Sequence, residues 1–349
     1  MTLKALLNWS KDEFSHLPWR QDRSLYRTLV SEIMLQQTTV GTVKNHYERF
    51  LKRFPTLQSL ASSSEDELTV AWKGLGYYRR ARNLKKIAEE ITLQHAGVFP
   101  EDLDTLLRIP GIGPYTANAI LGIGMDKRAL AVDANLERVI SRLFGIQAQK
   151  GLKLQKEIQT LFLDKKIFTN KVSFRQLNES LMDLGRTFCQ ARKATCELCP
   201  LKKECMAFSS GEPLSLPLTT QVKLKKVENN IHLLRVVVSK KNKVLVCKRQ
   251  KNEWLSGQFE IPTFIISTTD KSLKQYPHFP GIPEHDFSFS FVTSITKYKI
   301  KNSVLVIPEK EFNALGVSLE TEWRSIDNEN SNLTTATLKT LTKLGLKKS

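Results

Sequence analysis

Long apolar runs are missing from this sequence of 349 residues. A membrane-spanning helix needs about 18 consecutive apolar residues, and no stretch approaches that length, which excludes an integral membrane protein. The N-terminal segment also lacks the apolar core of a secretion signal, so we expect a protein that is not secreted. That segment contains several charged side chains instead: Lys4, Lys11, Asp12, Glu13, Arg20, Asp22 and Arg23.

Acidic residues are scarce relative to basic ones. The chain has 35 Asp and Glu against 53 Lys and Arg, a formal charge of +18. Such a surplus favours a polyanionic partner, most often nucleic acid and less often an anionic membrane surface. The 41% hydrophobic and 25% charged residues are ordinary for a globular protein, which excludes long disorder or a fibrous repeat. The length predicts two domains.

The spacing of apolar residues changes along the chain. Up to about residue 210 it is helical, in the segments 25–37, 43–54, 65–72, 81–95, 103–109, 114–123, 135–143 and 174–188. Further on, β-branched runs predict strands and the last apolar pattern predicts a helix, at 231–238, 243–248, 287–292, 295–300, 303–307 and 333–344. We therefore predict a mainly α domain at 1–210, a linker at 211–230 and a smaller α+β domain at 231–349.

Cysteine is rare, yet four of the five cysteines fall within 17 residues. They have the spacing C-x6-C-x2-C-x5-C: Cys189, Cys196, Cys199 and Cys205. Disulfides are disfavoured without a secretion signal, whereas four soft thiolates in one loop suit zinc or a [4Fe–4S] cluster. Zinc sites usually pair two short-spaced knuckles. Only the middle pair is short-spaced here, which favours the larger iron–sulfur cluster.

A turn that contains two glycines joins two predicted helices at 109–115, with the sequence IPGIGPY. Gly111 and Gly113 let the backbone turn tightly without a Cβ penalty, and Pro114 suits the first position of the following helix. Backbone amides at such a turn point outward and form an anion site. A phosphate of a nucleic-acid backbone would fit there without sequence recognition.

Together these motifs resemble a known family. The glycine turn, the later Val132-Asp133 and the cysteine loop look like the endonuclease III superfamily of DNA base-excision glycosylases. Within it, residues 31–38, SEIMLQQT, and 74–78, GLGYY, are similar to the MutY-type adenine DNA glycosylases. The resemblance covers roughly residues 5–210.

The resemblance implies a helix-hairpin-helix glycosylase fold with a [4Fe–4S] cluster held by the four cysteines of the loop 189–205. It implies double-stranded DNA with 8-oxoguanine:adenine or guanine:adenine mispairs as the partner, and no membrane. It also implies a monomer, which in a bacterium would be cytoplasmic and associated with the nucleoid.

Breaking an N-glycosidic bond requires protonation of the leaving base and stabilisation of a sugar cation, which suits two carboxyl groups in different environments. Glu32 lies on a predicted helix beside Leu29 and Leu35, whose apolar wall should raise its pKa and suit it as a general acid. The resemblance assigns it protonation of adenine at N7. Asp133 precedes a predicted helix, where it could be an N-cap. The resemblance makes it the carboxylate that stabilises, or transiently bonds, the anomeric carbon.

Tyr115 decides the reaction type. Bifunctional glycosylase/lyases of this superfamily have a lysine at the matching position, which forms a Schiff base with the sugar, and a phenol cannot do so. We therefore expect monofunctional hydrolysis by water, with Tyr115 hydrogen-bonding near Glu32 or the flipped nucleotide and Asn135 orienting water or the sugar. Ala134 stands where the family usually has glycine, which denies the positive φ that glycine permits without, we expect, removing activity.

The target base must leave the duplex to be reached. By the resemblance, Gln37 and Tyr77 form the wedge that fills the gap, the amide replacing lost pairing contacts and the ring stacking beside the opposing base. Three arginines that follow either contact phosphates or form a solvated basic helix face: Arg79, Arg80 and Arg82. The resemblance also implies an adenine pocket lined by Trp19, Arg20, Leu35, Val40 and Glu179, in which Glu179 recognises the base edge.

The second domain resembles the Nudix-like recognition domain of this family through residues 254–262, WLSGQFEIP. The glutamate-rich box of a hydrolytic Nudix enzyme does not follow, so we expect binding of the damaged guanine rather than hydrolysis. The best match to the family's lesion-recognition hairpin is Ile295-Thr296-Lys297, which makes Thr296 the candidate contact. Ser288, in Phe287-Ser288-Phe289, is a competing candidate.

Two other functions remain as alternatives. One is an endonuclease III-like bifunctional glycosylase/lyase acting on oxidised pyrimidines, against which Tyr115 and the second domain argue. The other is a catalytically silent iron–sulfur DNA-binding protein, against which the joint presence of Glu32 and Asp133 argues. A Nudix phosphohydrolase is the least favoured.

Overall fold

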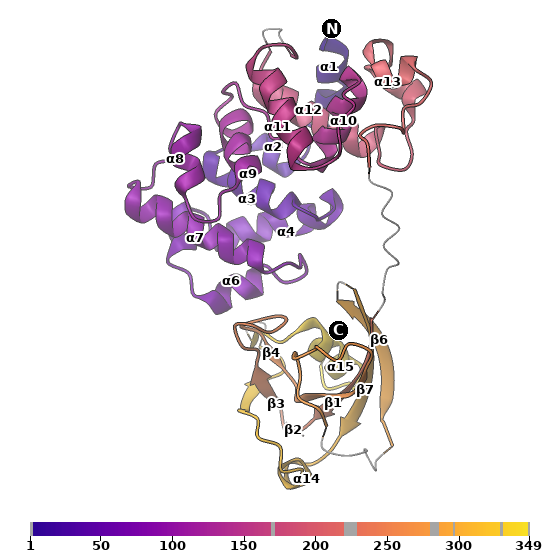
Figure 1. The fold of residues 1–349 in the computed structure, drawn as a ribbon. Coiled ribbons are helices and arrows are strands. Elements are labelled where there is room, and N and C mark those ends of the chain that lie inside the picture. The colour runs from indigo at the N-terminus through magenta and orange to yellow at the C-terminus, as the bar shows by residue number, and fades with distance from the viewer. Residues whose placement is uncertain are drawn as a thin grey trace. The chain divides into compact units, whose positions relative to one another are not determined.

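The computed structural model describes residues 3–168, 172–219, 229–279, 286–295, 297–328 and 331–347 (Figure 1). They form two compact units. The first, here called the helical unit, comprises Met1–Ser63 and Gly74–Val222, and the second, the α+β unit, comprises Ser64–Lys73 and Lys223–Ser349. In the ranges just given, no helix has both the length and the apolar character needed to cross a membrane.

The predicted fold classes, a mainly helical part followed by a smaller α+β part, are confirmed. The predicted boundaries at 210 and 230 stay a prediction, because residues 220–228 of the proposed linker lie outside the described residues. The short helix α6 (Glu65–Ala71) groups with the α+β unit.

The helical unit consists of α-helices joined by short connections, with short 3-10 and π segments. Its α-helices are α1 (Lys4–Phe14), α2 (Pro18–Gln21), α3 (Leu25–Leu35), α4 (Val40–Arg53), α5 (Leu57–Ala61), α7 (Arg79–Gln94), α8 (Leu103–Arg108), α9 (Pro114–Ala119), α10 (Ala134–Phe144), α11 (Leu152–Leu163), α12 (Phe174–Thr187) and α13 (Met206–Ser209). The non-α helical segments are η1 (Ile120–Gly124), η2 (Cys196–Leu198) and η3 (Lys202–Glu204).

Side-chain caps begin the helices that matter for the site. Ser24, Thr39 and Asp133 accept hydrogen bonds from backbone amides in the first turns of α3, α4 and α10. Those amides have no partner inside the helix, so each cap stabilises a helix start. Helix α10 ends at Gly145, whose φ of 65° is the left-handed conformation typical of a helix C-terminus.

Helix α10 lies in an apolar core of the helical unit. Its Leu136 and Ile140 are fully buried and pack in one cluster with Phe162 of α11 and Leu181 of α12. Helix α1, the first in the chain, lies against α12 (Figure 1). This packing fixes the start of α10, where Asp133 lies.

The predicted helix at 114–123 differs from the structure. The α-helix ends at Ala119 and continues as the π-helix η1, a wider turn that is frequent at functional sites. In this turn Gly122 packs so closely that a Cβ would lie 2.5 Å from the Ala129 carbonyl oxygen and 2.8 Å from the Asn178 amide nitrogen. The apolar spacing alone contains no signal for this change of pitch.

The described residues of the α+β unit form two sheets. The first has the order β5-β1-β7-β6, with β1 and β7 parallel and the other neighbours antiparallel; in the second, β3 pairs with β2, β4 and β8. Besides α6, the elements are β1 (Asn229–Val237), β2 (Ser239–Lys240), β3 (Lys243–Lys248), β4 (Phe259–Glu260), β5 (Thr263–Thr268), β6 (Phe289–Ile295), β7 (Tyr298–Val306), α14 (Glu309–Ala314), β8 (Glu322–Ser325) and α15 (Thr335–Lys343).

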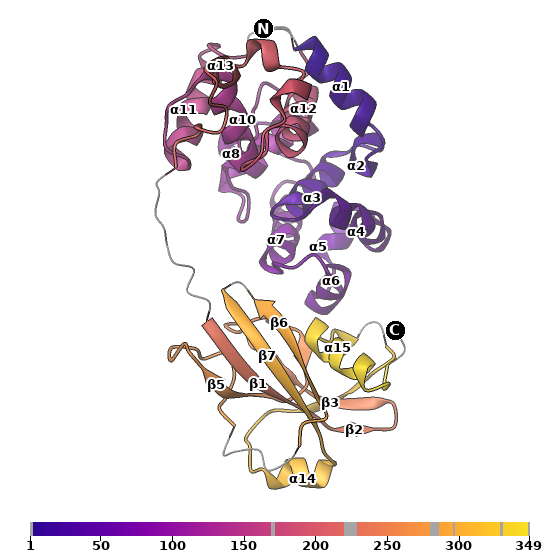
Figure 2. The same cartoon turned by 90° about the vertical axis from the view of Figure 1, so that its right-hand side faces the viewer.

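Apolar clusters cover both faces of β1. Val237 packs in one cluster with Leu341 of α15, and Val236 packs in another with Phe312 of α14. Figure 2 shows α15 beside the sheet that contains β1 and β7.

The sequence predicted separate strands at 295–300 and 303–307, whereas Ile295 is the last residue of β6 and Tyr298–Val306 form one strand, β7. Buried Asn302 interrupts the apolar pattern in its middle, where Arg235 donates to its Oδ1 at 2.7 Å and its Nδ2 donates to Thr293 Oγ1 at 2.9 Å. Arg235 also pairs with Glu260 at 2.7 Å, and both side chains are almost fully buried. In the sequence, the polar Asn302 therefore looked like a break between two strands, although its side chain is buried and hydrogen-bonded within one strand's sheet.

Candidate active site

A cavity of about 840 Å³ lies in the helical unit, lined by residues of α2, α3, α9 and α12 and of the starts of α4 and α10. Nine of the predicted site residues line it: Trp19, Arg20, Glu32, Leu35, Val40, Tyr115, Asp133, Asn135 and Glu179. The structure therefore brings the catalytic candidates and the pocket candidates together, although they come from segments far apart in the sequence.

Glu32 is buried on α3, with only 5% of its surface exposed. The Tyr115 hydroxyl donates a hydrogen bond to Glu32 Oε2 at 2.6 Å. Burial raises the pKa of Glu32 to about 7, the nearby charges of Glu179 and Asp133 add to the rise, and the Tyr115 hydrogen bond opposes it. An acid with a pKa near neutral pH can donate a proton at physiological pH, which suits a general acid.

Asp133 caps the start of helix α10 and also lines the cavity. Its Oδ1 accepts from the backbone amides of Asn135 and Leu136, each at 2.9 Å, and its Oδ2 accepts from Asn135 Nδ2 at 3.2 Å. Burial raises the pKa of Asp133, opposed by these hydrogen bonds. Ala134 is the first residue of α10, a position that needs no glycine.

The segment that leads into Asp133 is held by Asn178, a residue that the sequence analysis did not single out. Asn178 is fully buried on α12. Its Oδ1 accepts from the Ala131 amide at 2.8 Å, and its Nδ2 donates to the carbonyls of Ala129 at 2.9 Å and Phe174 at 2.7 Å. An asparagine inside an amphipathic helix has no distinguishing pattern, so only the structure identifies this role.

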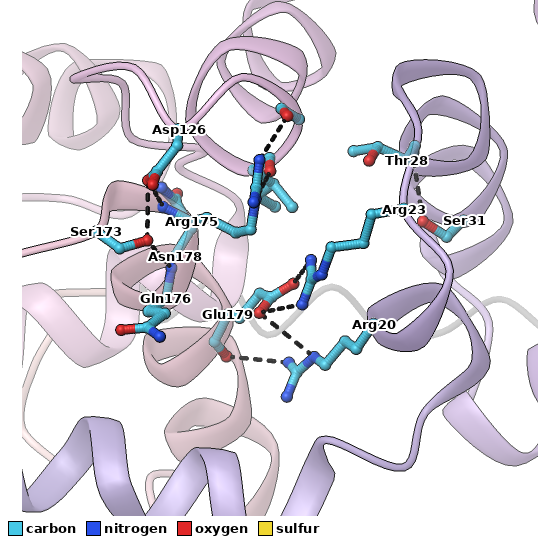
Figure 3. A network of polar contacts seen from close by, with 12 residues as sticks. Arg20, Arg23, Thr28, Ser31, Asp126, Ser173, Arg175, Gln176, Asn178 and Glu179 are labelled. Atoms are coloured by element: carbon cyan, nitrogen blue, oxygen red, sulfur yellow. Dashed lines mark hydrogen bonds and ion pairs between the residues drawn. The ribbon is translucent and has the colours of Figure 1, made fainter.

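Glu179 is engaged by arginines at the cavity wall (Figure 3). Arg23 donates to both of its carboxylate oxygens, at 2.7 and 3.2 Å, and Arg20 Nε lies 3.7 Å from Oε2. Arg20 also binds Asp183 through both terminal nitrogens, at 2.8 and 3.0 Å. Arg20 and Glu179 are predicted site residues, whereas no local pattern indicates Arg23 or Asp183, because packing determines the partners in an ion-pair network.

The predicted wedge residues do not line the cavity. Gln37 follows the end of α3 and Tyr77 precedes α7, both with left-handed backbone, at φ 56° and 47°. Tyr77 is 58% exposed, which suits a ring that contacts a partner. Arg80 is only 9% exposed, and its guanidinium binds backbone carbonyls. Its suggested contact with phosphate is therefore wrong, while Arg79 is exposed.

The glycine turn joins α8 to α9 as expected. Gly111 has φ 101°, and a Cβ there would lie 3.3 Å from the Asn83 carbonyl oxygen, so glycine is required for backbone shape and for close approach. Gly113 is the N-cap of α9, with open space beside it. Contact of this turn with phosphate stays a prediction.

The four clustered cysteines line one small cavity of about 30 Å³. Buried Arg142 donates to Cys189 Sγ at 3.3 Å, and burial raises the pKa of Cys199 to about 11. In the described ranges no group of three or more His, Cys, Asp or Glu is arranged as a metal site. Four thiols that share one cavity beside a guanidinium nevertheless have the chemistry of a thiolate-ligated centre.

Helix α10 connects the cysteine loop to the active site. Arg138 donates to the Cys189 carbonyl at 2.6 Å and to Asn135 Oδ1 at 2.9 Å. Arg142 lies one turn further along the same helix. The first cysteine and the side chain beside Asp133 are thus held by the same guanidinium.

The candidate lesion contacts belong to the α+β unit. Thr296 lies outside the described residues. Ser288 is exposed, and its backbone amide donates to the Val304 carbonyl at 2.8 Å. The choice between these two residues stays a prediction.

Comparison with known proteins defines the class. Residues 30–163 match the family described as HhH-GPD superfamily base excision DNA repair protein. The solved structure of a thermostable thymine-DNA glycosylase is similar, with a TM-score of 0.52 and 28% identity over 60% of this chain and 95% of that chain. The helical unit therefore has the HhH-GPD glycosylase fold.

Two relatives identify the family within this class. The adenine DNA glycosylase of Buchnera aphidicola subsp. Schizaphis graminum is 34% identical over 259 residues, which cover 74% of this chain and 70% of that protein. The adenine DNA glycosylase of Homo sapiens is 37% identical over 212 residues, covering 58% of this chain and 38% of that protein. The chain belongs to the adenine DNA glycosylase family.

The hydrogen bond from Tyr115 tunes the acidity of Glu32. Because it stabilises the ionised carboxylate, Tyr115→Phe should raise the pKa of Glu32 further, by about one unit for a charge-assisted bond. Carbon-13 NMR of labelled glutamate carboxyls across a pH titration measures this pKa. Tyr26→Phe is the control, since the Tyr26 hydroxyl binds the Phe54 carbonyl instead. An unchanged or lowered pKa in Tyr115→Phe would contradict the assignment.

Proposed function

We propose that this protein is a monofunctional adenine DNA glycosylase that hydrolyses the N-glycosidic bond of adenine mispaired with 8-oxoguanine or guanine. The observation that carries the proposal is a buried Glu32 with a pKa of about 7, in the same cavity as Asp133 and Tyr115. Membership of the adenine DNA glycosylase family supports adenine as the base removed.

The reaction needs a proton for the base and a counter-charge for the sugar. Glu32 donates its proton to adenine, at N7 in our proposal, and the bond between the base nitrogen and the anomeric carbon breaks, its electron pair leaving with adenine. The Asp133 carboxylate stabilises the resulting oxocarbenium cation. Water then bonds to the anomeric carbon, and the proton that it loses restores the acid on Glu32. Asn135, bound to Asp133, orients the water or the sugar.

The wall of the cavity supports hydrolysis rather than a lyase reaction. A Schiff base requires a primary amine, and the described residues that line the cavity include no lysine. Tyr115 occupies the position after the glycine turn and binds Glu32 through its hydroxyl. We therefore assign the final replacement of adenine on the deoxyribose to water.

The pocket suits a flipped purine. Trp19, Leu35 and Val40 supply apolar wall, while Arg20 and Glu179 supply polar contacts for the base edge. A flipped base must be replaced in the duplex, and the exposed Gln37 and Tyr77 suit that role. Amides of the turn at Gly111 and Gly113 suit the DNA backbone.

The cysteine loop suits a [4Fe–4S] cluster. Cys189, Cys196, Cys199 and Cys205 would hold it, with Arg142 beside them to offset thiolate charge. When bound, the cluster would supply metal–thiolate bonds that tie the loop into one rigid piece. Arg138 of α10 then holds that loop next to Asn135.

The α+β unit suits lesion recognition with a Nudix-like fold. Its mixed sheet covered by α15 is compatible with that fold, and we assign contact with 8-oxoguanine to Thr296, with Ser288 as the competing residue. The partner is double-stranded DNA, bound by a monomer. In a bacterial cell the protein would act in the cytoplasm at the nucleoid.

The function is tested with a duplex that has one 8-oxoguanine:adenine pair. We expect strand scission at the adenine only after alkali, because base removal leaves an intact abasic strand. A duplex with an adenine:thymine pair is the control and should stay uncut. Scission without alkali would indicate a lyase, and no scission under either condition would indicate a silent binder.

Removal of the acid should slow catalysis strongly without loss of binding. Glu32→Gln should lower the single-turnover rate constant by about 10²- to 10⁴-fold, the usual contribution of a general acid. Its duplex affinity should match that of the native protein. Glu48→Gln, an exposed glutamate on α4, should keep the native rate. A normal rate in Glu32→Gln would refute the assignment.

In the native protein the single-turnover rate should fall as pH rises through about 7, because Glu32 then loses its proton.

The cofactor is tested by purification without oxygen. The protein should be brown and hold about four iron atoms per chain, as a [4Fe–4S] centre requires. Cys199→Ser should lower the iron content, whereas Cys247→Ser, outside the loop, should keep it. Stoichiometric zinc in place of iron would overturn this part of the proposal.

A further inference from the structure

We infer that Arg80 is a positioning residue that holds the loops of Gln37 and Tyr77 in one arrangement, so that the two side chains act together when a base leaves the duplex. This inference rests on the proposed function, because it assumes that these residues fill the gap. Its structural part, a shared support for two loops, is testable without catalysis.

One side of the Arg80 guanidinium binds the end of α3. Nη1 donates to the carbonyl oxygens of Ile33 at 3.0 Å and Met34 at 2.8 Å, and also to that of Gln36. The last carbonyls of a helix have no partner within the helix and have partial negative charge. A buried cation there therefore stabilises the helix end from which Gln37 follows.

The other side of the Arg80 guanidinium binds the loop that contains Gln37 and the loop that contains Tyr77. Nη2 donates to Thr38 Oγ1 at 2.9 Å, to the Leu75 carbonyl at 3.0 Å and to the Gly76 carbonyl at 3.3 Å. Contacts at Gln36 and Thr38 lie on both sides of Gln37, and the contact at Gly76 directly precedes Tyr77. One planar group thus fixes the backbone next to each exposed side chain.

Both exposed residues have backbone that needs support. Gln37 and Tyr77 have φ of 56° and 47°, the left-handed region that residues with a Cβ rarely adopt. Such conformations persist where surrounding contacts determine them. The ring of Tyr77 also lies 5.7 Å from the Arg80 guanidinium carbon. Arg80 therefore supports both strained residues at once.

An arginine is needed for this geometry. Its planar fork presents several donors in fixed directions, whereas lysine has a compact ammonium group that cannot reach two loops in the same way. Arg80 is also buried, so its charge does not contact phosphate. Its contribution to DNA processing acts through the positions of Gln37 and Tyr77, which lowers the cost of ordering them when the base leaves the stack.

Hydrogen exchange of the free, full-length protein tests the support directly. Arg80→Lys should raise amide exchange in 36–38 and in 75–78 together, by about 10-fold or more, while α10 keeps its protection. Arg79→Lys, on the exposed neighbour, should change neither segment. If Arg80→Lys does not fold, Thr38→Val removes one acceptor and should raise exchange in both segments by a smaller factor. Unchanged exchange, or a rise in only one segment, overturns the inference.

Excision kinetics separate positioning from chemistry. On a fully paired duplex with 8-oxoguanine opposite adenine, Arg80→Lys should lower the single-turnover rate by about 10-fold. With mismatches beside the adenine, which make the base easy to unstack, the loss should shrink to about 3-fold or less. Equal losses on both duplexes would show damage to the active site and refute the positioning role. If the native protein excises neither adenine, the proposed function fails, and the exchange result still decides whether Arg80 supports both loops.

Discussion

Burial of the Glu32 carboxyl is the constraint on which the helical unit depends. Water no longer stabilises its charge, so the carboxyl favours the protonated form and must have polar partners at a defined distance. The Tyr115 hydroxyl at the start of α9 is such a partner, because it donates a hydrogen bond to Glu32. Asp133 at the start of α10 adds a like charge, which favours the protonated form further. The packing of α10 against α11 and α12, together with Asn178, keeps the start of α10 in place.

Arginine provides much of the internal polar structure. Arg80, Arg138, Arg142 and Arg235 are each less than 10% exposed. They bind helix-end carbonyls, the cysteine loop or a buried glutamate rather than solvent. Among the described residues, these four and Arg249 are balanced by five buried acidic residues, so the formal surplus of +18 stays at the surface: Glu32, Glu137, Glu179, Asp183 and Glu260. The guanidinium fork suits these positions because it satisfies several carbonyls at once.

Prediction from sequence succeeded for site residues whose side-chain chemistry and local helix pattern indicate the same role. Glu32 lies on an amphipathic helix and Asp133 at a helix start, and the structure places both in one cavity. Prediction failed where a contact between distant segments overrides the local pattern. Arg80, in a basic run, looked like a phosphate ligand but is buried against two loops. Buried Asn302 looked like a strand break because its partner, Arg235, comes from another strand.

The sequence by itself determined the helical and α+β parts, the glycine turn, the cysteine spacing and the residue types that base excision requires. These follow from periodicity and from chemistry carried by short segments. Only the tertiary structure decided that Glu32 is an acid with a pKa near neutral, that Arg23 binds Glu179, and that one arginine supports both Gln37 and Tyr77. Proton affinity and ion pairing depend on burial and on distances between segments far apart in the chain, and no local pattern contains those quantities.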